Sequence, residues 1–148
     1  MIRPAHAEDV DAVSQLVRDA YGRYVARLGK QPGPMLDDYA RRVADAQVWM
    51  LEDEGSLAAI LVLEDGEGGA LLLDNLAVAP NAQGKGHGRT LVAFAEAEAR
   101  RRGHAEIRLY THVLMAENLA IYGRLGFAET HRVTEKGYDR VYMVKRTA

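Results

Sequence analysis

Apolar residues follow two different spacings along the chain, and each spacing predicts one kind of element. Residues 7–20 place their apolar positions on one helical face, with acidic residues in the first turn, where the helix dipole favours them. The runs LAAILVL and ALLLDNLAV, within residues 56–64 and 70–78, are nearly continuous and predict strands buried on both faces. Shorter strands are predicted at residues 2–3 and 48–52.

Glycine and proline mark the breaks between these elements. The second half of residues 21–35 is too rich in Gly and Pro for a continuous helix and predicts a bend or lid, followed by a short helix at residues 36–46. The later elements are predicted as helices at residues 90–102 and 116–125, a strand at 105–112, and a hairpin of 127–133 and 138–145. This order, without a linker or an internal repeat, predicts a single domain over residues 1–148.

The composition is that of an ordinary globular protein and excludes several classes of function. The chain has 148 residues, a hydrophobic fraction of 48% and a formal net charge of −2, so no overall basic field attracts nucleic acid. The absence of cysteine excludes disulfides, thiolate zinc sites and a cysteine nucleophile. No ligand spacing such as HExxH predicts a metal. The N-terminus lacks the apolar core of a signal peptide, and no run approaches the length of a membrane span. A cytoplasmic protein without membrane contact is expected.

The segment QGKGHGR, residues 83–89, joins the end of a buried strand to the start of a helix. A Walker A loop would need a glycine followed by Lys and then Ser or Thr, and a dinucleotide-binding loop would need a third glycine where Arg89 stands. The pattern that remains is Q-x-x-G-x-G, formed by Gln83, Gly86 and Gly88. Because such a junction offers backbone N–H groups and the positive end of a helix dipole, the predicted ligand is a phosphate.

The strand LDNLAVAP, followed by QGKGHGR and a helix, resembles the acetyl-CoA signature of the GCN5-related N-acetyltransferases, the GNAT family. Further on, ENLAIYGRLGF resembles that family's motif of an Asn, a Tyr four residues later and a closing Gly-Phe. The resemblance implies an α/β fold with a mixed, mostly antiparallel, V-shaped sheet of about seven strands flanked by about four helices. It also implies acetyl-CoA as co-substrate and transfer of its acetyl group to a primary amine of a small molecule, a peptide or a protein.

By the same resemblance, the pantetheine arm hydrogen-bonds the main chain of the fourth strand, and the pyrophosphate binds the backbone of the glycine loop. The implied cofactor-binding residues are Leu76, Ala77 and Val78 on the strand, Gln83, Gly84, Lys85, Gly86, His87, Gly88, Arg89 and Thr90 in and after the loop, and Asn118 and Tyr122 on a later helix. Asn118 and Tyr122 share one helix face, so Asn118 can hold the pantetheine while Tyr122 reaches the sulfur. Without the resemblance, these two residues are better explained as a helix cap and a core aromatic.

The implied reaction is direct attack of a neutral amine on the thioester, which requires a base, oxyanion stabilisation and protonation of the leaving thiolate. Tyr122 is the predicted acid, because a phenol can protonate a developing thiolate. Asp74, a carboxylate inside an apolar strand, and His112, at a strand end, are the candidate bases, and an ordered water is the third. A structural Asp and a solvent-facing His are the alternative interpretations.

The acceptor is predicted only in outline. In this family the first two helices and the terminal hairpin commonly border the acceptor. Here these segments carry Tyr21, Tyr24, Arg27, Met35, Tyr39, Tyr138 and Tyr142, and the first five are the candidate acceptor-binding residues. The tyrosines either line a pocket or cover the surface, while Arg23 and Arg27 would suit a carboxylate-bearing acceptor. The main alternative to an enzyme is a non-catalytic acyl-CoA-binding sensor on the same fold. Homodimers are common among such proteins, but the sequence decides neither the oligomeric state nor the length of the acyl chain.

Overall fold

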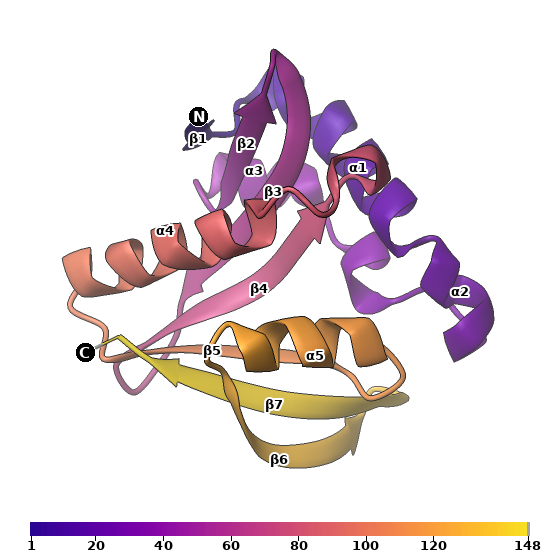
Figure 1. Cartoon of the computed structure of the whole chain (residues 1–148), viewed down its shortest axis with the longest axis vertical. Coiled ribbons are helices and arrows are strands. Elements are labelled where there is room, and N and C mark those ends of the chain that lie inside the picture. The colour runs from indigo at the N-terminus through magenta and orange to yellow at the C-terminus, as the bar shows by residue number, and fades with distance from the viewer. Residues whose placement is uncertain (148) are drawn as a thin grey trace. The chain divides into compact units, whose positions relative to one another are not determined.

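The computed structural model describes residues 1–147, which fall into two compact units (Figure 1). The first unit comprises Met1–Leu63 and Asn75–Leu91, and the second comprises Glu64–Asp74 and the chain from Val92 onward. The strands belong to a seven-stranded sheet in the order β1-β2-β3-β4-β5-β7-β6, in which β4 and β5 are parallel. The predicted fold class, a mixed and mostly antiparallel sheet with helices, is confirmed.

The elements alternate along the chain much as the sequence predicts. The strands are β1 (Ile2–Pro4), β2 (Val48–Asp53), β3 (Ser56–Asp65), β4 (Ala70–Val78), β5 (Glu106–His112), β6 (Ala128–Glu135) and β7 (Tyr138–Arg146). The α-helices are α1 (Val10–Tyr21), α2 (Arg23–Leu28), α3 (Tyr39–Ala44), α4 (His87–Arg101) and α5 (Ala116–Arg124). Three short 3-10 turns are η1 (Ala7–Asp9), η2 (Gly33–Leu36) and η3 (Pro80–Ala82). No helix within residues 1–147 is long and apolar enough to cross a membrane.

In the first unit, β1, β2 and β3 are antiparallel neighbours. Ile2 lies opposite Leu51, and Met50 lies opposite Ile60. The β3 side chains at positions 58–63 are at most 3% exposed, so this strand is buried on both faces, as its apolar run predicts.

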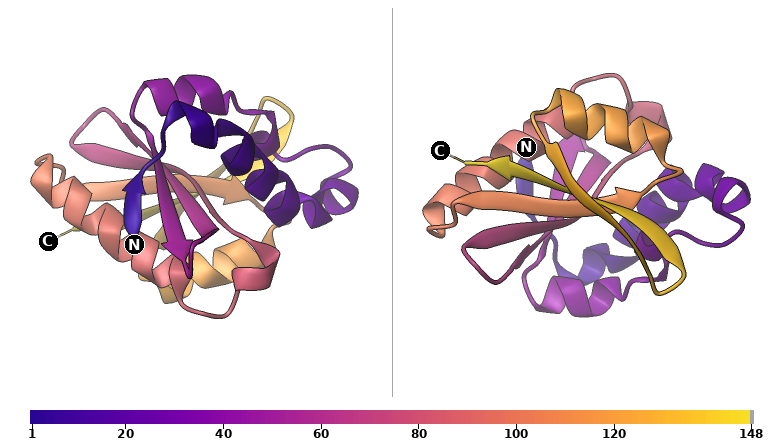
Figure 2. Two further views of the ribbon diagram at one scale, coloured as in Figure 1. Left: turned by 90° about the horizontal axis from the view of Figure 1, so that it is seen from above. Right: turned by 90° about the horizontal axis from the view of Figure 1, so that it is seen from below.

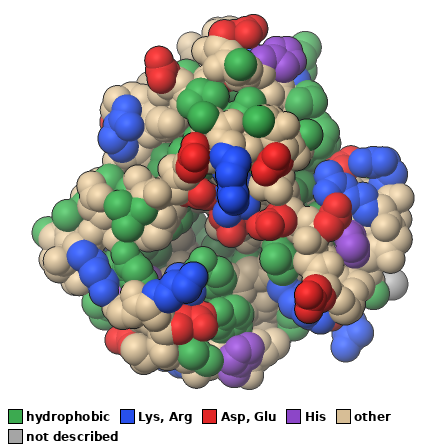
Figure 3. Space-filling model, turned by 180° about the vertical axis from the view of Figure 1, so that it is seen from behind, with side chains coloured by type: hydrophobic (Ala, Val, Ile, Leu, Met, Phe, Trp, Pro, Cys, Tyr) green, Lys and Arg blue, Asp and Glu red, His purple; other side chains and the backbone are tan. Residues whose placement is uncertain are grey.

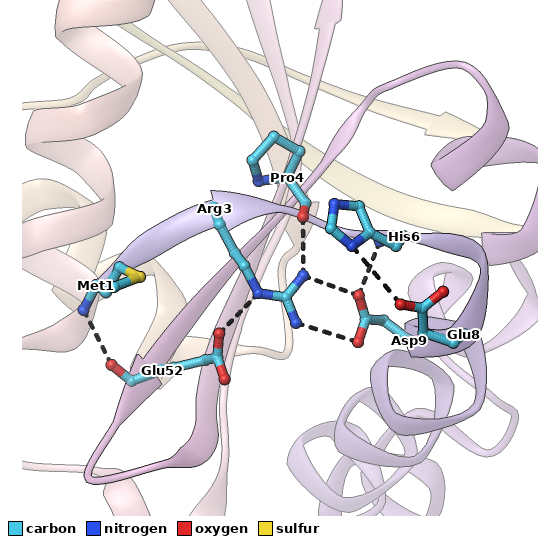
Figure 4. Close-up of polar contacts among 7 residues, drawn as sticks. All are labelled: Met1, Arg3, Pro4, His6, Glu8, Asp9 and Glu52. Carbon is cyan, nitrogen blue, oxygen red and sulfur yellow. Dashed lines mark hydrogen bonds and ion pairs between the residues drawn. The ribbon is translucent and has the colours of Figure 1, made fainter.

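An ion-pair cluster fixes the start of the chain to β2 and to the first helical turn (Figure 4). The Arg3 guanidinium donates to Glu52 Oε1 at 2.7 Å and to both carboxylate oxygens of Asp9, at 2.9 and 3.2 Å. Asp9 also accepts the backbone N–H of His6 at 2.8 Å. These bonds, first of all the one from Arg3, lower the pKa of the Asp9 carboxyl.

The start and end residues of the helices between β1 and β2 differ in part from the predicted ones, and local interactions explain them. The predicted helix from residue 7 starts as the 3-10 turn η1 and becomes α-helical only at Val10. The predicted bend after Tyr21 contains the short helix α2, which is followed by its C-cap Gly29 in the left-handed conformation with a φ of 76°. Helix α3 starts three residues later than predicted, at Tyr39, because the Asp38 carboxylate caps it by accepting the N–H of Arg41 at 3.1 Å.

Strand β4 corrects one prediction. Its sequence, ALLLDNLAV, suggested burial on both faces, but from Leu71 onward the side chains alternate between buried and half-buried. Leu73, Asn75 and Ala77 are buried, whereas Leu76 and Val78 are half-buried. The prediction was wrong because a run of apolar residues does not reveal which face is covered.

In the second unit, β5 pairs with β7 in an antiparallel ladder from Glu106 opposite Arg146 to His112 opposite Arg140. β6 and β7 form a long, strongly twisted antiparallel hairpin (Figure 2). The pairing of these two strands shifts register between Glu129 and His131. The parallel ladder between β4 and β5 contains three residue pairs and ends at Leu72 opposite Arg108. Lys145 on β7 donates to Glu96 Oε1 at 2.7 Å and thereby fixes helix α4 to this sheet.

Candidate active site

The glycine loop joins the end of β4 to the start of α4 through the turn η3. Gly84 and Gly86 have φ angles of 82° and 83°, in the left-handed region where side chains are strained. Helix α4 starts at His87, three residues before the predicted start, so His87, Gly88 and Arg89 form its first turn. The sequence therefore predicted the position of this strand–helix junction correctly, but the loop before the helix is three residues shorter than predicted.

The first turn of α4 has the properties of an anion-binding site. The N–H and the hydroxyl of Thr90 both donate to the Gly86 carbonyl oxygen, each at 3.1 Å, and close this turn. The N–H groups before Thr90 have no carbonyl one turn earlier in the helix to bind, and they point along the helix dipole. Gln83, Lys85 and Arg89 have exposed side chains around this turn. Backbone donors and two exposed cations thus lie at one helix end, an arrangement suited to phosphate groups.

His87 and Gly88 contribute to this turn in different ways. The His87 imidazole is largely buried, with Nε2 3.4 Å from Asp53 Oδ2 on the β2–β3 hairpin but without the geometry of a hydrogen bond. Its ring thus lies beside the hairpin with Nε2 buried, and the backbone N–H is the group that this residue offers a ligand at the helix end. A Cβ atom at Gly88 would lie 3.9 Å from Leu76 Cδ2, an ordinary contact. Packing within the protein therefore does not require a glycine at this position.

In the second unit, Asn118 and Tyr122 lie on α5 as predicted. Asn118 is the third residue of the helix, which begins after Met115, so it does not cap the helix, and its Nδ2 lies 3.7 Å from Met115 Sδ. The Tyr122 ring is buried and packs edge-on against Phe127, with ring centroids 5.6 Å apart. Burial raises the pKa of the Tyr122 hydroxyl above its ordinary value, so the hydroxyl stays protonated even at pH values where an exposed tyrosine ionises.

The two candidate bases are in different situations. Asp74 lies on β4 with a half-buried side chain. His112 ends β5, where its Nδ1 accepts the backbone N–H of Leu114 at 3.1 Å, and its ring packs edge-on against Tyr138 at 6.1 Å. Among residues 1–147 no three His, Cys, Asp or Glu side chains are gathered as metal ligands would be.

The predicted acceptor residues are all in the first unit, and the tyrosines among them are buried. Tyr21, Tyr24 and Tyr39 are at most 6% exposed, so the interpretation as surface cover is wrong for these three. Arg27 is exposed, and its guanidinium carbon lies 5.2 Å from the centre of the Tyr24 ring. Met35 is half-buried in the turn η2.

Asn75 is a further functional candidate, which no motif in the sequence indicated. Its buried side chain accepts a hydrogen bond from the Tyr21 hydroxyl at 2.7 Å and donates one to the Tyr39 hydroxyl at 3.0 Å. The available signal was an amide within an otherwise apolar strand, since a buried amide requires hydrogen-bonding partners.

Charged side chains elsewhere are mostly balanced by neighbours. Arg101 and Arg102 at the end of α4 both bind Glu98, and Arg102 and His104 both bind Asp65. The face seen in Figure 3 likewise has basic and acidic side chains interspersed. These arginines therefore form ion pairs at the end of α4 in addition to meeting solvent.

The glycine turn at the start of a helix and the Asn-Tyr pair on a later helix are the features by which the sequence resembled acetyltransferases. A model of the acetyltransferase (GNAT) family matches residues 10–127, which is most of the chain, and the protein belongs to this family. The resemblance stated from the motifs is thus confirmed.

Solved acetyltransferase structures share the fold. The PaiA N-acetyltransferase from Thermoplasma acidophilum, in complex with coenzyme A, is 20% identical, with a TM-score of 0.81 over 99% of this chain and 98% of that chain. The ribosomal-protein-alanine N-acetyltransferase from Brucella melitensis is 26% identical, with a TM-score of 0.76 over 99% of each chain. YncA from Salmonella typhimurium, with its cofactor acetyl-CoA, is 21% identical, with a TM-score of 0.74 over 100% of this chain and 94% of that chain. No curated protein matches the sequence.

Proposed function

We propose that this acetyltransferase-family protein transfers the acetyl group of acetyl-CoA to a primary amine. The observation that carries the proposal is the first turn of α4, where helix N-terminal N–H groups follow two left-handed glycines and adjoin the exposed side chains of Lys85 and Arg89. The family match runs from residue 10 to residue 127 and includes parts of both units, which supports a single transferase domain.

In this proposal the cofactor lies along the end of β4 and the start of α4. The backbone of residues 84–90 holds the pyrophosphate, and Gln83 and the cations beside it add exposed polar contacts. The main chain of Leu76, Ala77 and Val78 holds the pantetheine arm, as a strand edge holds a peptide. Asn118 adds a polar contact to the same arm. No metal is proposed, since amine attack on a thioester needs none.

The chemistry begins when a neutral amine attacks the thioester carbonyl, and the resulting oxyanion is held by main-chain N–H groups of residues 75–78. As the intermediate collapses, the C–S bond breaks and the sulfur needs a proton. Tyr122 is the proposed donor, because a phenol is protonated at neutral pH and can donate its proton to a developing thiolate. Asp74 or an ordered water is the proposed base. We do not assign this role to His112, whose Nδ1 lone pair is engaged by the Leu114 N–H.

The acceptor is proposed to carry an anionic group. Arg23 and Arg27 are exposed, one helical turn apart on α2, and both lie over the ring of the buried Tyr24, at 4.9 and 5.2 Å. Stacking on an aromatic ring orients a guanidinium, and guanidinium groups suit the planar, bidentate recognition of a carboxylate. The name of the Brucella neighbour, an alanine N-acetyltransferase, supports an amine as the acceptor.

The test has two stages. Thermal unfolding is measured with acetyl-CoA, CoA or ATP and in buffer alone, for the wild type and for Gly86→Asp, which places a carboxylate at the glycine turn. A ligand that binds only the native state stabilises it by about 2.7 kcal/mol at a hundredfold excess over its Kd. Release of free thiol from acetyl-CoA is then followed with a panel of amines that carry or lack a carboxylate.

Stabilisation by both CoA compounds, its absence with ATP and its loss in Gly86→Asp are expected, followed by amine-dependent thiol release. If neither CoA compound stabilises the protein, the proposal is wrong. If CoA binds but no amine accelerates thiol release, the protein is the non-catalytic sensor.

A further inference from the structure

Asn75 is a buried amide held between two tyrosines from different segments of the first unit. Its side chain lies on the buried face of β4 and the whole residue is 3% exposed. The Tyr21 hydroxyl, at the end of α1, donates to Oδ1 at 2.7 Å, and Nδ2 donates to the Tyr39 hydroxyl, at the start of α3, at 3.0 Å. A buried amide without partners would be costly, and here both of its polar atoms are bonded.

The hydrogen bonds continue beyond the two tyrosines to main-chain carbonyls. The Tyr39 hydroxyl donates to the Pro34 carbonyl oxygen in η2 at 2.5 Å. The Tyr21 hydroxyl also lies 3.3 Å from the carbonyl oxygen of Leu76. An unbroken chain of polar contacts therefore leads from Leu76, through Asn75, to the turn that carries Met35 and Leu36.

At one end of this chain, two acceptors compete for one proton. A tyrosine hydroxyl has a single hydrogen, so the 2.7 Å bond from Tyr21 to Asn75 and the 3.3 Å contact with Leu76 cannot both be at full strength. A ligand that rearranges hydrogen bonding at the main chain of Leu76 changes this balance. The change is transmitted to Asn75 through the bond at Oδ1. Because the Asn75 amide is rigid and planar, it is transmitted further to Tyr39 through the bond at Nδ2.

At the other end of this series of contacts lies the turn η2, which packs beside α1. The turn η2 has four residues, none of them buried, and Leu36 is 62% exposed. The Tyr39–Pro34 bond joins it to the capped start of α3, where the ion pair of Arg42 with Asp37 at 2.9 Å adds a second link. A short turn without a buried residue is expected to open locally and to respond to the loss of one hydrogen bond.

We propose that Asn75 is a positioning residue that couples ligand binding at the main chain of Leu76 to the conformation of the turn η2, through Tyr21 and Tyr39. The inference rests on the proposed function, because acetyl-CoA is the ligand expected at Leu76. It assigns to Asn75 the task of ordering Met35 and its neighbours, the acceptor side of the protein, once the cofactor is bound.

The test is hydrogen–deuterium exchange of two peptides, covering residues 33–39 and 76–82, with and without saturating CoA. Tyr39→Phe removes one hydroxyl and cuts the chain between Asn75 and Pro34. Tyr21→Phe removes the hydroxyl between Leu76 and Asn75, and this variant is used in place of Tyr39→Phe if the latter does not fold. Tyr24→Phe is the matched control, because this tyrosine is equally buried and its hydroxyl binds Arg23, outside the chain.

In the wild type, CoA is expected to slow exchange in both peptides, by at least about fivefold in residues 33–39, the lower end of typical couplings. Tyr39→Phe keeps the protection at residues 76–82 and loses it at 33–39, whereas Tyr24→Phe keeps both. The proposal is overturned if CoA protects residues 76–82 alone in the wild type, or if both chain-cutting variants retain the protection at 33–39. Absence of CoA protection at residues 76–82 in the wild type, together with absent binding, would instead refute the proposed function.

Discussion

The backbone N–H of Leu114 donates a hydrogen bond to Nδ1 of His112, at 3.1 Å. A neutral imidazole has one ring nitrogen with a lone pair and one with a proton, so this bond assigns the proton to Nε2. A general base needs a lone pair that is free to take a proton. His112 therefore fits the role of a structural residue that shapes the turn after β5.

We expect His112→Asn to retain the turnover of the wild type within a few-fold. An asparagine oxygen can accept the N–H of the residue two positions later, so the turn is kept while the imidazole ring is lost. The measurement is kcat as a function of pH with saturating acetyl-CoA. The comparison variant is Asp74→Asn, which should lower kcat about a hundredfold if Asp74 is the base. A hundredfold loss in His112→Asn, with loss of the acidic limb of the profile, would return the base role to His112.

Tyr122→Phe is expected to lower kcat about a hundredfold while the Kd for CoA changes little. The variant removes only the hydroxyl that protonates the leaving thiolate and keeps the ring that packs against Phe127. Turnover and calorimetric CoA binding are measured on the same preparation. An equal loss of affinity and turnover would mean that the hydroxyl serves binding, and the acid role would be withdrawn.

The raised pKa of Tyr122 also has a consequence for stability. In the folded protein this hydroxyl keeps its proton above the ordinary tyrosine pKa, while the unfolded chain loses it near pH 10. Between these two values the native state binds more protons, so the free energy of unfolding falls as pH rises, by up to about 1.4 kcal/mol per pH unit from this group. Urea unfolding of wild type and Tyr122→Phe from about pH 8 to about pH 11 isolates the effect, because the other tyrosines contribute to both. Parallel curves for the two proteins would show that the shift is absent.

Two glycines of the loop are expected to respond differently to alanine. Gly86→Ala places a side chain at a φ of 83° and should destabilise the protein by about 1–2 kcal/mol. Gly88→Ala should not destabilise it, because the position is helical and a Cβ there makes only an ordinary contact with Leu76. It should nevertheless weaken CoA binding at least about tenfold, because a methyl group would keep the pyrophosphate from the backbone. Unfolding and CoA titrations separate the two effects, and unchanged CoA affinity in Gly88→Ala would remove this turn as the phosphate site.

Glu98 is expected to stabilise the end of α4. Its carboxylate accepts from Arg101 at 3.0 and 2.9 Å and from Arg102 at 3.1 Å, and these partners, Arg101 first, lower the pKa of Glu98. Glu98→Gln should cost about 1–2 kcal/mol at neutral pH. A lowered pKa contributes stability above the ordinary glutamate pKa and loses it as pH falls, so the difference from wild type should shrink below about pH 4. Glu8→Gln, at an exposed position, is the control. A difference that does not depend on pH would assign the effect to packing.

Local chemistry determined what the sequence could predict by itself. The glycine junction was located from seven consecutive residues, because backbone donors at a strand–helix boundary need no distant partner to bind an anion. Helix periodicity and apolar runs similarly predicted the order of the elements. The Asn118–Tyr122 pair follows from helix geometry alone.

Only the tertiary structure decided which polar groups meet. Tyr21 and Tyr39 are separated from Asn75 by 54 and 36 positions, and no local pattern links them. The same holds for β4, whose apolar run did not reveal that Leu76 lies on its less buried face. Side-chain hydrogen bonds and one-sided burial arise when segments pack against each other, and a spacing along the chain contains no record of that packing.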